Sequence, residues 1–128
     1  MRILYVEDDS MNRRVVRDMF ASLGMDLDEA PDVATGLRMV DAANFDAIVT
    51  DLMMPEADGL ALISAIRRRA DAGASVPILV LTADTSDIAR VNCLQGGAND
   101  VMTKPVGIAT LVERLGRVMA ASQNMIFN

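Results

Sequence analysis

Apolar and polar positions follow two rhythms along the chain, and together they predict five strands and five helices. Short continuous apolar runs are typical of strands buried on both faces of a parallel sheet, whereas apolar residues that recur every three or four positions indicate amphipathic helices. Because parallel strands need crossovers that cover the sheet, their alternation predicts an α/β sheet with helices on both faces. The predicted strands are Arg2–Val6, Met25–Ala30, Asp46–Thr50, Pro77–Thr82 and Asp100–Thr103. The predicted helices are Met11–Leu23, Pro31–Ala43, Leu60–Ala70, Thr85–Leu94 and Ile108–Ala121.

The last predicted helix carries a clear apolar stripe, after which the pattern is lost. The sequence of 128 residues contains no internal repeat, linker or low-complexity segment. We therefore expect one domain over residues 1–121 and a frayed tail over residues 122–128. The stripe consists of Leu111, Val112, Leu115, Val118 and Met119.

Composition narrows the classes of protein that this fold can serve. Hydrophobic residues make up 52% of the chain, but aromatic residues only 3%, so aliphatic side chains and ten methionines must fill the core. The net charge of −6 argues against direct binding to nucleic acid. No apolar run approaches the ~20 residues of a membrane span, and Glu7-Asp8-Asp9 follows the amino-terminal apolar run too early for a secretory signal. With a single cysteine, these features predict a cytoplasmic domain without membrane insertion.

Four of the predicted strands end in polar residues that can take part in chemistry. Glu7 and Asp8 follow the first strand, and Asp51 follows the third. Thr82 ends the fourth strand, and Lys104 follows the fifth. The carboxyl ends of parallel strands lie on one edge of the sheet, which is where open α/β sheets bind ligands. Carboxylates that converge there repel one another unless a proton or a cation intervenes, and hard oxygen ligands favour Mg²⁺.

The only lysine strengthens this interpretation. Of the twelve basic residues eleven are arginine, and the compact ammonium of Lys104 is not interchangeable with a guanidinium. The alternative is a solvated lysine in a loop. Given the carboxylates and the hydroxyl expected beside it, we favour a site that receives a phosphoryl group on an aspartate nucleophile.

The same motifs resemble those of receiver domains from two-component response regulators. The resemblance runs in the family's order over nearly the whole chain. It implies the flavodoxin-like (βα)5 fold, a three-layer sandwich around a parallel sheet of strand order 2-1-3-4-5. The matching segments are Val6-Glu7-Asp8-Asp9, Asp51–Gly59, Leu81-Thr82-Ala83 and Gly97–Asp100 leading to Lys104-Pro105.

The resemblance implies phosphoryl chemistry for three of these residues. Asp51 is the expected phosphoacceptor, Thr82 would bond a phosphoryl oxygen, and Lys104 would pair first with Asp51 and then with the phosphate. The Lys104–Pro105 peptide bond is expected to be cis. Receiver domains usually carry an aromatic residue three positions before this lysine, where this chain has Val101. We therefore expect movement of Thr82 and the following loop, rather than of a ring, to carry the signal to the next helix.

The resemblance also implies Mg²⁺ as the cofactor and a set of ligands for it. Asp8 and Asp51 would bind the ion directly, together with the backbone carbonyl of Met53. Glu7 would act through a metal-bound water. Asp84 would either orient the water that removes the phosphoryl group or cap the following helix, and the residues do not decide between these roles.

Other charged or reactive residues have simpler interpretations. Arg67–Arg69 is interpreted as the solvated, positively charged end of a helix rather than a patch for nucleic acid. Arg13, Arg14 and Arg17 suit a solvated face and a partner-docking face equally well. Cys93 is expected to be a packing residue, because no second cysteine can pair with it.

We interpret the chain as a phosphorylation-activated switch rather than an enzyme acting on a separate substrate. It would accept a phosphoryl group from a histidine kinase or a histidine phosphotransfer protein and later release it by its own chemistry. It would bind a downstream target protein through the fourth helix, the fifth strand and the fifth helix, as a monomer or weak dimer. A relay intermediate, or a receiver excised from a hybrid kinase, is the first alternative, and Asn12 after the acidic motif leans toward it.

Two alternatives come from other classes of protein. A flavodoxin-like binder of a small ligand would need a phosphate cradle after the first strand, where Glu7-Asp8-Asp9 would repel a phosphate that lacks a metal. A metal-dependent phosphatase would need an acid–base residue shortly after Asp51, and Leu52-Met53 supplies none.

Overall fold

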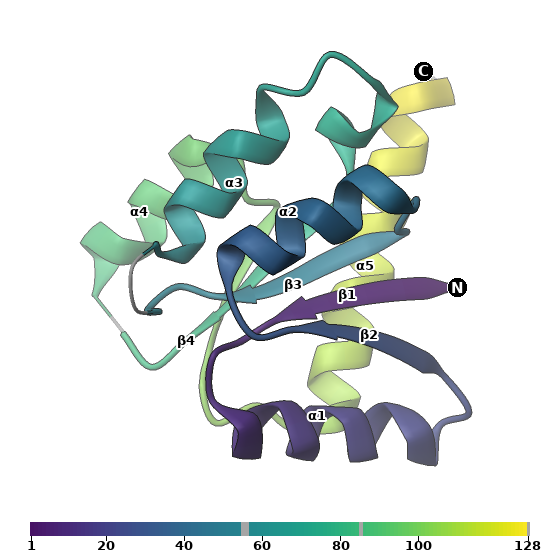
Figure 1. Ribbon diagram of the computed structural model, residues 1–128, viewed down its shortest axis with the longest axis vertical. Helices are drawn as coiled ribbons and strands as arrows, with labels where there is room; N and C mark the ends of the chain where they lie inside the picture. The colour runs from purple at the N-terminus through teal and green to yellow at the C-terminus, as the bar shows by residue number, and fades with distance from the viewer. Residues whose placement is uncertain (55–56, 85, 128) are drawn as a thin grey trace.

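A five-stranded parallel sheet forms the centre of the molecule (Figure 1). The structure is a computed structural model that describes residues 1–54, 57–84 and 86–127, with side chains described through residue 121. Its strand order is β2-β1-β3-β4-β5, which confirms the predicted flavodoxin-like order. The strands are β1 (Arg2–Val6), β2 (Asp26–Ala30), β3 (Ala47–Asp51), β4 (Ile78–Thr82) and β5 (Asp100–Thr103).

Helices cover both faces of the sheet, as the alternation of elements predicts. One layer contains α1 (Ser10–Ser22) and α5 (Ile108–Phe127). The other contains α2 (Val33–Ala42), α3 (Gly59–Arg67) and α4 (Asp87–Gly96), and a short 3-10 helix, η1 (Ala72–Ser75), precedes β4. The backbone of α5 stays helical through Phe127, past the expected end at Ala121, and Asn128 lies outside the described residues.

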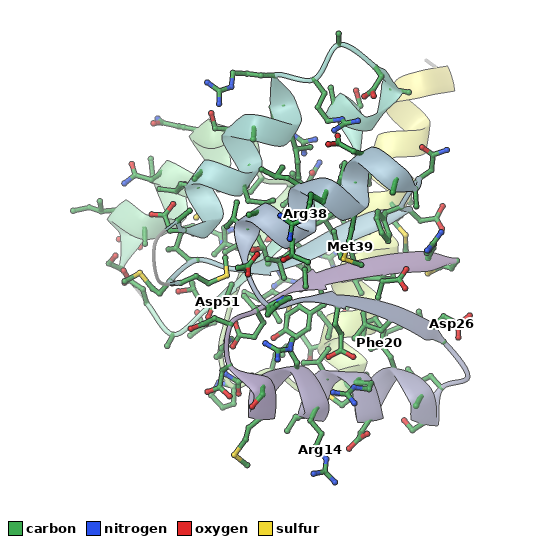
Figure 2. All side chains as sticks on the ribbon, viewed as in Figure 1. Arg14, Phe20, Asp26, Arg38, Met39 and Asp51 are labelled. Atoms are coloured by element: carbon green, nitrogen blue, oxygen red, sulfur yellow. The ribbon has the colours of Figure 1, made fainter. Side chains whose placement is uncertain are left out.

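The period-two alternation of the strands divides the core into two halves. Along β1, Leu4 and Val6 face α2, α3 and α4, whereas Ile3 and Tyr5 face α1 and α5. Phe20 points from α1 toward the sheet, as Figure 2 shows. Both halves are aliphatic apart from a few rings, as the composition requires. The buried side chain of Cys93 belongs to the first half, which confirms its packing role.

Not every apolar residue in the predicted stripes of α1 and α5 is buried in the structure. On α1, Val16 and Phe20 are buried, but Val15 is 50% exposed and Leu23, just past the helix end, is 49% exposed. On α5, Leu111, Leu115 and Val118 are buried, whereas Val112 and Met119 are only partly so. A helix packed on one side of a sheet buries only the centre of its apolar stripe.

Polar side chains fix where the helices begin. Asp9 accepts hydrogen bonds from the N–H groups of Met11 and Asn12, which starts α1 one residue earlier than predicted. Ser86 caps α4 by accepting a hydrogen bond from Ala89 N–H, so this helix begins at Asp87 rather than at Thr85, which lies outside the described residues.

A close approach at Gly59 positions the loop that follows β3. Gly59 N–H donates to the carbonyl of Leu52 at 2.9 Å. A methyl group on Gly59 would lie 2.5 Å from the carbonyl oxygen of Asp51, which is closer than real atoms approach. The start of α3 therefore rests directly on the backbone at the end of β3.

Two of the three arginines at the end of α3, Arg67 and Arg69, are bound rather than solvated, so the sequence interpretation is wrong for these two. Arg67 donates through Nε to the carbonyl of Gly97 at 2.9 Å. Its two terminal nitrogens donate to the carbonyls of Ala74 and Val76 and to Oδ1 of Asn99. Arg69 pairs with Asp41 and Asp71, and only Arg68 is exposed. Instead of forming a solvated positive helix end, Arg67 and Arg69 hold the neighbouring loops together through hydrogen bonds and ion pairs.

None of the described helices is both long enough and apolar enough to cross a membrane.

Candidate functional site

The predicted site residues lie together at the carboxyl-end edge of the sheet. Glu7 and Asp8 directly follow β1, and Asp51 is the last residue of β3. Thr82 is the last residue of β4, and Lys104 directly follows β5. Figure 2 labels Asp51 at this edge. Because β1, β3, β4 and β5 are parallel neighbours, their ends deliver side chains from distant parts of the sequence to one place.

Three carboxylates form the acidic part of the site. One oxygen from each of Glu7, Asp8 and Asp51 lies within 4.8 Å of the others. Glu7 is 1% exposed and Asp51 8%, whereas Asp8 is exposed to solvent. Two of the three negative charges are thus taken out of water, which raises the cost of keeping all three ionised.

The ammonium of Lys104 contacts two of the three carboxylates. Its Nζ lies 3.2 Å from Oδ2 of Asp51 and 3.2 Å from Oε1 of Glu7. The backbone N–H of Lys104 donates to the carbonyl of Thr82 at 2.8 Å, which holds the end of β5 against the end of β4. The Lys104–Pro105 peptide bond is cis, as predicted.

The two oxygens of Glu7 have different surroundings. Oε1 accepts from Nδ2 of Asn12 at 2.7 Å and from Nζ of Lys104 at 3.2 Å. Oε2 is buried and has no hydrogen-bond partner among the described residues. Burial raises the pKa of Glu7 to about 7, helped by the neighbouring carboxylate of Asp51 and opposed by Asn12 and Lys104. The cluster therefore relieves its crowded charge by taking up a proton near neutral pH, or by binding a cation.

The first turn of α1 holds the backbone of the acidic loop. Arg13 donates through Nη1 to the carbonyls of Glu7 at 2.7 Å and Asp8 at 3.0 Å. Arg17 pairs with Glu29 of β2 at 2.8 Å. Arg14, in contrast, points away from the helix into solvent (Figure 2). The sequence pattern of α1 gave no sign that Arg13 and Asn12 belong to the site, because helical spacing does not show which residues face the preceding loop.

The loop after β4 orients Thr82. Its buried hydroxyl oxygen accepts from the backbone N–H of Asp84 at 3.0 Å, so the hydroxyl proton is not used in that bond. The carboxylate of Asp84 accepts from Ser86 N–H at 2.8 Å, which lowers the pKa of Asp84. Ser86, not Asp84, is the residue that caps α4.

Met53 and Val101, two residues singled out from the sequence, have different surroundings. The backbone N–H of Met53 points to Oδ1 of Asp51 at 3.4 Å, while its side chain is 66% exposed. Val101 of β5 is buried in the half of the core that faces α2, α3 and α4, and Nη1 of Arg90 donates to its carbonyl at 3.0 Å. No ring stands at this position, so the core around it is aliphatic.

The donor set fits a hard divalent cation. All the clustered ligand atoms are carboxylate oxygens, which suit Mg²⁺ better than softer metals. The unpartnered Oε2 of Glu7 is a buried acceptor that a hydrated ion would satisfy. The opposite ammonium leaves one side of Asp51 facing a cationic group that can bind an incoming anion.

Known sequences place these features in one family. The family model of the response regulator receiver domain matches residues 3–116. The chain is 39% identical over 116 residues to the transcriptional regulatory protein QseB of Haemophilus influenzae, covering 90% of the chain and 51% of QseB. It is 35% identical over 119 residues to the chemotaxis protein CheY-3 of Vibrio cholerae, covering 92% of the chain and 91% of CheY-3. The chain thus spans about half the length of QseB and nearly all of CheY-3.

Solved structures agree with these relatives. The receiver domain of the sensor histidine kinase PA1611 from Pseudomonas aeruginosa, solved with a magnesium ion coordinated in its active site cleft, has a TM-score of 0.84 and 36% identity, with 93% of this chain and 97% of that one covered. The chemotaxis protein CheY4 of Vibrio cholerae has a TM-score of 0.84 and 30% identity, with 91% and 97% covered. The chain therefore belongs to the family of response regulator receiver domains of two-component signalling.

Proposed function

We propose that Asp51 accepts a phosphoryl group from a phosphohistidine and that the modified domain binds a target protein. In the transfer, a carboxylate oxygen of Asp51 forms a bond to phosphorus while the bond from phosphorus to the histidine nitrogen breaks. The single observation that carries this proposal is the position of Asp51, which belongs to the acidic cluster and contacts the ammonium of the only lysine. Such a carboxylate combines a nucleophile with groups that bind phosphoryl oxygens.

The chain's own residues would stabilise the phosphoryl group in defined ways. The hydroxyl of Thr82, which accepts from Asp84 N–H, keeps its proton to donate to a phosphoryl oxygen. Lys104, 3.2 Å from Asp51, has only to turn from the carboxylate to the new phosphate. Burial of Thr82 and Asp51 strengthens these interactions, because the local dielectric constant is lower than that of water.

The resident cofactor in this proposal is Mg²⁺. Asp8, Asp51 and the backbone carbonyl of Met53 would hold it, and Glu7 would contact it through water. When bound, the ion neutralises charge on the transferring phosphoryl oxygens. Support from this chain comes from the all-oxygen cluster and the unpartnered Oε2 of Glu7. Support from a relative comes from the magnesium ion in the PA1611 receiver domain.

The partner would be bound by the face formed by α4, β5 and α5. Contacts tie these elements together, because Asp100 at the start of β5 pairs with Arg114 of α5 at 2.6 Å, and Arg90 of α4 binds the carbonyl of Val101. Ile88 of α4 is 75% exposed and Val91 46%, which offers apolar contact area. An added phosphate charge of about −1.5 to −2 beside Thr82 would shift α4 through the connecting loop.

A relay role is the second candidate. PA1611, at 36% identity, is a sensor histidine kinase that contains a receiver domain of the same fold. A relay would pass the phosphoryl group from Asp51 to the histidine of a phosphotransfer protein. A long-lived phosphoryl group with transfer back to histidine would favour relay, whereas rapid self-catalysed release would favour a terminal switch.

Labelling of Asp51 tests the proposed function. We expect acetyl phosphate or a phosphorylated kinase to label the wild type in the presence of Mg²⁺, and we expect no label after Asp51→Asn, because an amide is not a nucleophile for phosphorus. Mass spectrometry after borohydride reduction would locate the acyl phosphate. Acid-labile label that persists in Asp51→Asn would assign the acceptor role to another residue. Failure of the wild type to label with any donor would remove the proposal.

A further inference from the structure

The carboxylate of Glu7 is held from one side by a neutral amide. The side-chain amide of Asn12 donates to Oε1 at 2.7 Å, shorter than the 3.2 Å contact from Lys104 to the same oxygen. The other oxygen, Oε2, lies in a side chain that is 1% exposed and has no donor among the described residues. One oxygen is thus bound by the protein, and the other is left for a group that residues 1–54, 57–84 and 86–121 do not supply.

Local structure fixes Asn12 in this position. Asp9 accepts from the N–H of Asn12, which sets the first turn of α1. In the same turn, Arg13 binds the carbonyls of Glu7 and Asp8. The backbone of Asn12 and the backbone that carries Glu7 therefore belong to one hydrogen-bonded unit, which fixes the position from which the Asn12 amide reaches the carboxylate.

The two donors to Oε1 are expected to behave differently once Asp51 carries a phosphoryl group. Lys104 divides its ammonium between Glu7 and Asp51, each at 3.2 Å. In the proposed function this ammonium turns to the phosphoryl group, so Glu7 loses it. The Asn12 amide has no second acceptor in the part of the chain that the structure describes, and it carries no charge, so nothing there draws it from Glu7 and it does not repel a cation.

We propose that Asn12 is a positioning residue that holds Glu7 with Oε2 turned toward the hydrated divalent cation. The inference rests on the proposed function, because Glu7 is expected to act on the metal-bound water there. Residues that orient metal-binding carboxylates by a hydrogen bond often change metal affinity by 10–100-fold when removed, although they do not touch the metal. The structure thus assigns to α1 a part in cation binding as well as its packing role.

The direct test is a titration of Mg²⁺ into Asn12→Ala, followed by amide chemical shifts. We expect about a tenfold weaker apparent affinity than in the wild type, because Glu7 loses its permanent donor. Asn12→Gln, which keeps an amide one methylene farther out, should recover part of the affinity. The matched control is Asn92→Ala, which makes the same change at an exposed position of α4 and should bind Mg²⁺ as the wild type does.

Two further measurements separate positioning from a structural role. Urea unfolding without Mg²⁺ should give similar midpoints for Asn12→Ala and Asn92→Ala. Labelling of Asn12→Ala by acetyl phosphate should be slow at low Mg²⁺ and approach the wild-type rate at saturating Mg²⁺.

Three results would overturn the inference. Equal Mg²⁺ affinity in Asn12→Ala and wild type would do so while leaving the proposed function intact, as would a labelling defect that saturating Mg²⁺ does not relieve. Loss of the fold in Asn12→Ala and Asn12→Gln without Mg²⁺ would make Asn12 a structural residue only. A wild type that neither binds Mg²⁺ nor accepts label would instead remove the proposed function on which the inference rests.

Discussion

Lys104 and Arg67 are both partly buried cations with several hydrogen bonds, yet their surroundings differ in kind. Lys104 faces two carboxylates, Glu7 and Asp51, and one oxygen of Glu7 has no hydrogen-bond partner among the described residues. Arg67 faces only neutral oxygens, four in all, supplied by three backbone carbonyls and the side chain of Asn99. Lys104 thus lies beside a carboxylate with one unsatisfied oxygen, whereas Arg67 lies among acceptors that are satisfied.

This difference distinguishes a site that can bind a ligand from a network that only stabilises the fold. Fully satisfied polar networks make a fold rigid, whereas a partly satisfied cluster has free energy to gain from a proton, a metal or a phosphoryl group. Burial lowers the pKa of Arg67 and raises that of Glu7, in both cases because the charged form loses water. At Arg67 the carbonyl dipoles offset the lost hydration. At Glu7 the lost hydration is not offset until a proton, a metal or a phosphoryl group binds.

The largest effect should come from removing the satisfied cation. Arg67→Ala would leave the carbonyls of Ala74, Val76 and Gly97 without their donor, and we expect the free energy of unfolding to fall by about 3 kcal/mol. Urea denaturation followed by circular dichroism would measure it. Arg68→Ala, at the exposed neighbouring position, should change stability by less than about 0.5 kcal/mol. Equal stability of the two variants would show that the four bonds of Arg67 contribute nothing.

A smaller effect on stability, but a larger one on signalling, is expected at Lys104. Lys104→Arg keeps the charge, yet a planar guanidinium cannot occupy the point between Glu7 and Asp51. We expect the variant to fold and accept label, but to lose about 2 kcal/mol of coupling between the site and α4. Amide shifts of α4 on adding beryllofluoride and Mg²⁺ would measure this, with Arg68→Lys as the control. Wild-type shifts in Lys104→Arg would contradict the role given to the ammonium.

The smallest effect should appear as a pH dependence of the metal-free protein. The pKa of Glu7 is about 7 in the fold against 4.5 for an ordinary glutamate, so its contribution to stability is fully present below pH 4.5 and is lost as pH rises through 7. Between pH 6 and pH 8 we expect a loss of about 1 kcal/mol. Mg²⁺ binding should strengthen over the same interval, because protons and metal compete for the cluster.

Glu7→Gln is the matched control for that measurement, since it keeps the shape of the side chain and removes the titration. Its stability should be flat between pH 6 and pH 8. Asp32, Asp71 and Asp84 have lowered pKa values, so their contributions are lost only in acid, outside this interval. A slope that survives in Glu7→Gln would show that another group titrates.

The apolar runs alone predicted a parallel sheet and the edge where the chemistry gathers, because the runs stop at that edge, whereas the strand order came from the resemblance to receiver domains. Asp51, Glu7 and Lys104 each stand at the end of a strand, and a parallel sheet leaves no other place for them. The roles that individual residues have in catalysis or metal binding stay predictions, since the structure shows only their positions.

The features that the sequence did not predict depend on side-chain contacts that leave no periodic pattern in the sequence. The acceptors of Arg67 come from η1, from Val76 and from the loop after α4, up to 32 residues away in the chain. The bond from Asn12 to Glu7 depends on the direction in which the first turn of α1 faces its preceding loop. Side-chain caps such as Ser86 settle the ends of helices where several polar residues compete.

The contact at Gly59 would limit what phosphorylation is able to move. A methyl group at Gly59 would collide with the carbonyl oxygen of Asp51, so the start of α3 directly backs the main chain at the end of β3. In the proposed function, a phosphoryl group on Asp51 would therefore act on Thr82, Lys104 and the loop that leads to α4 rather than on the main chain behind it.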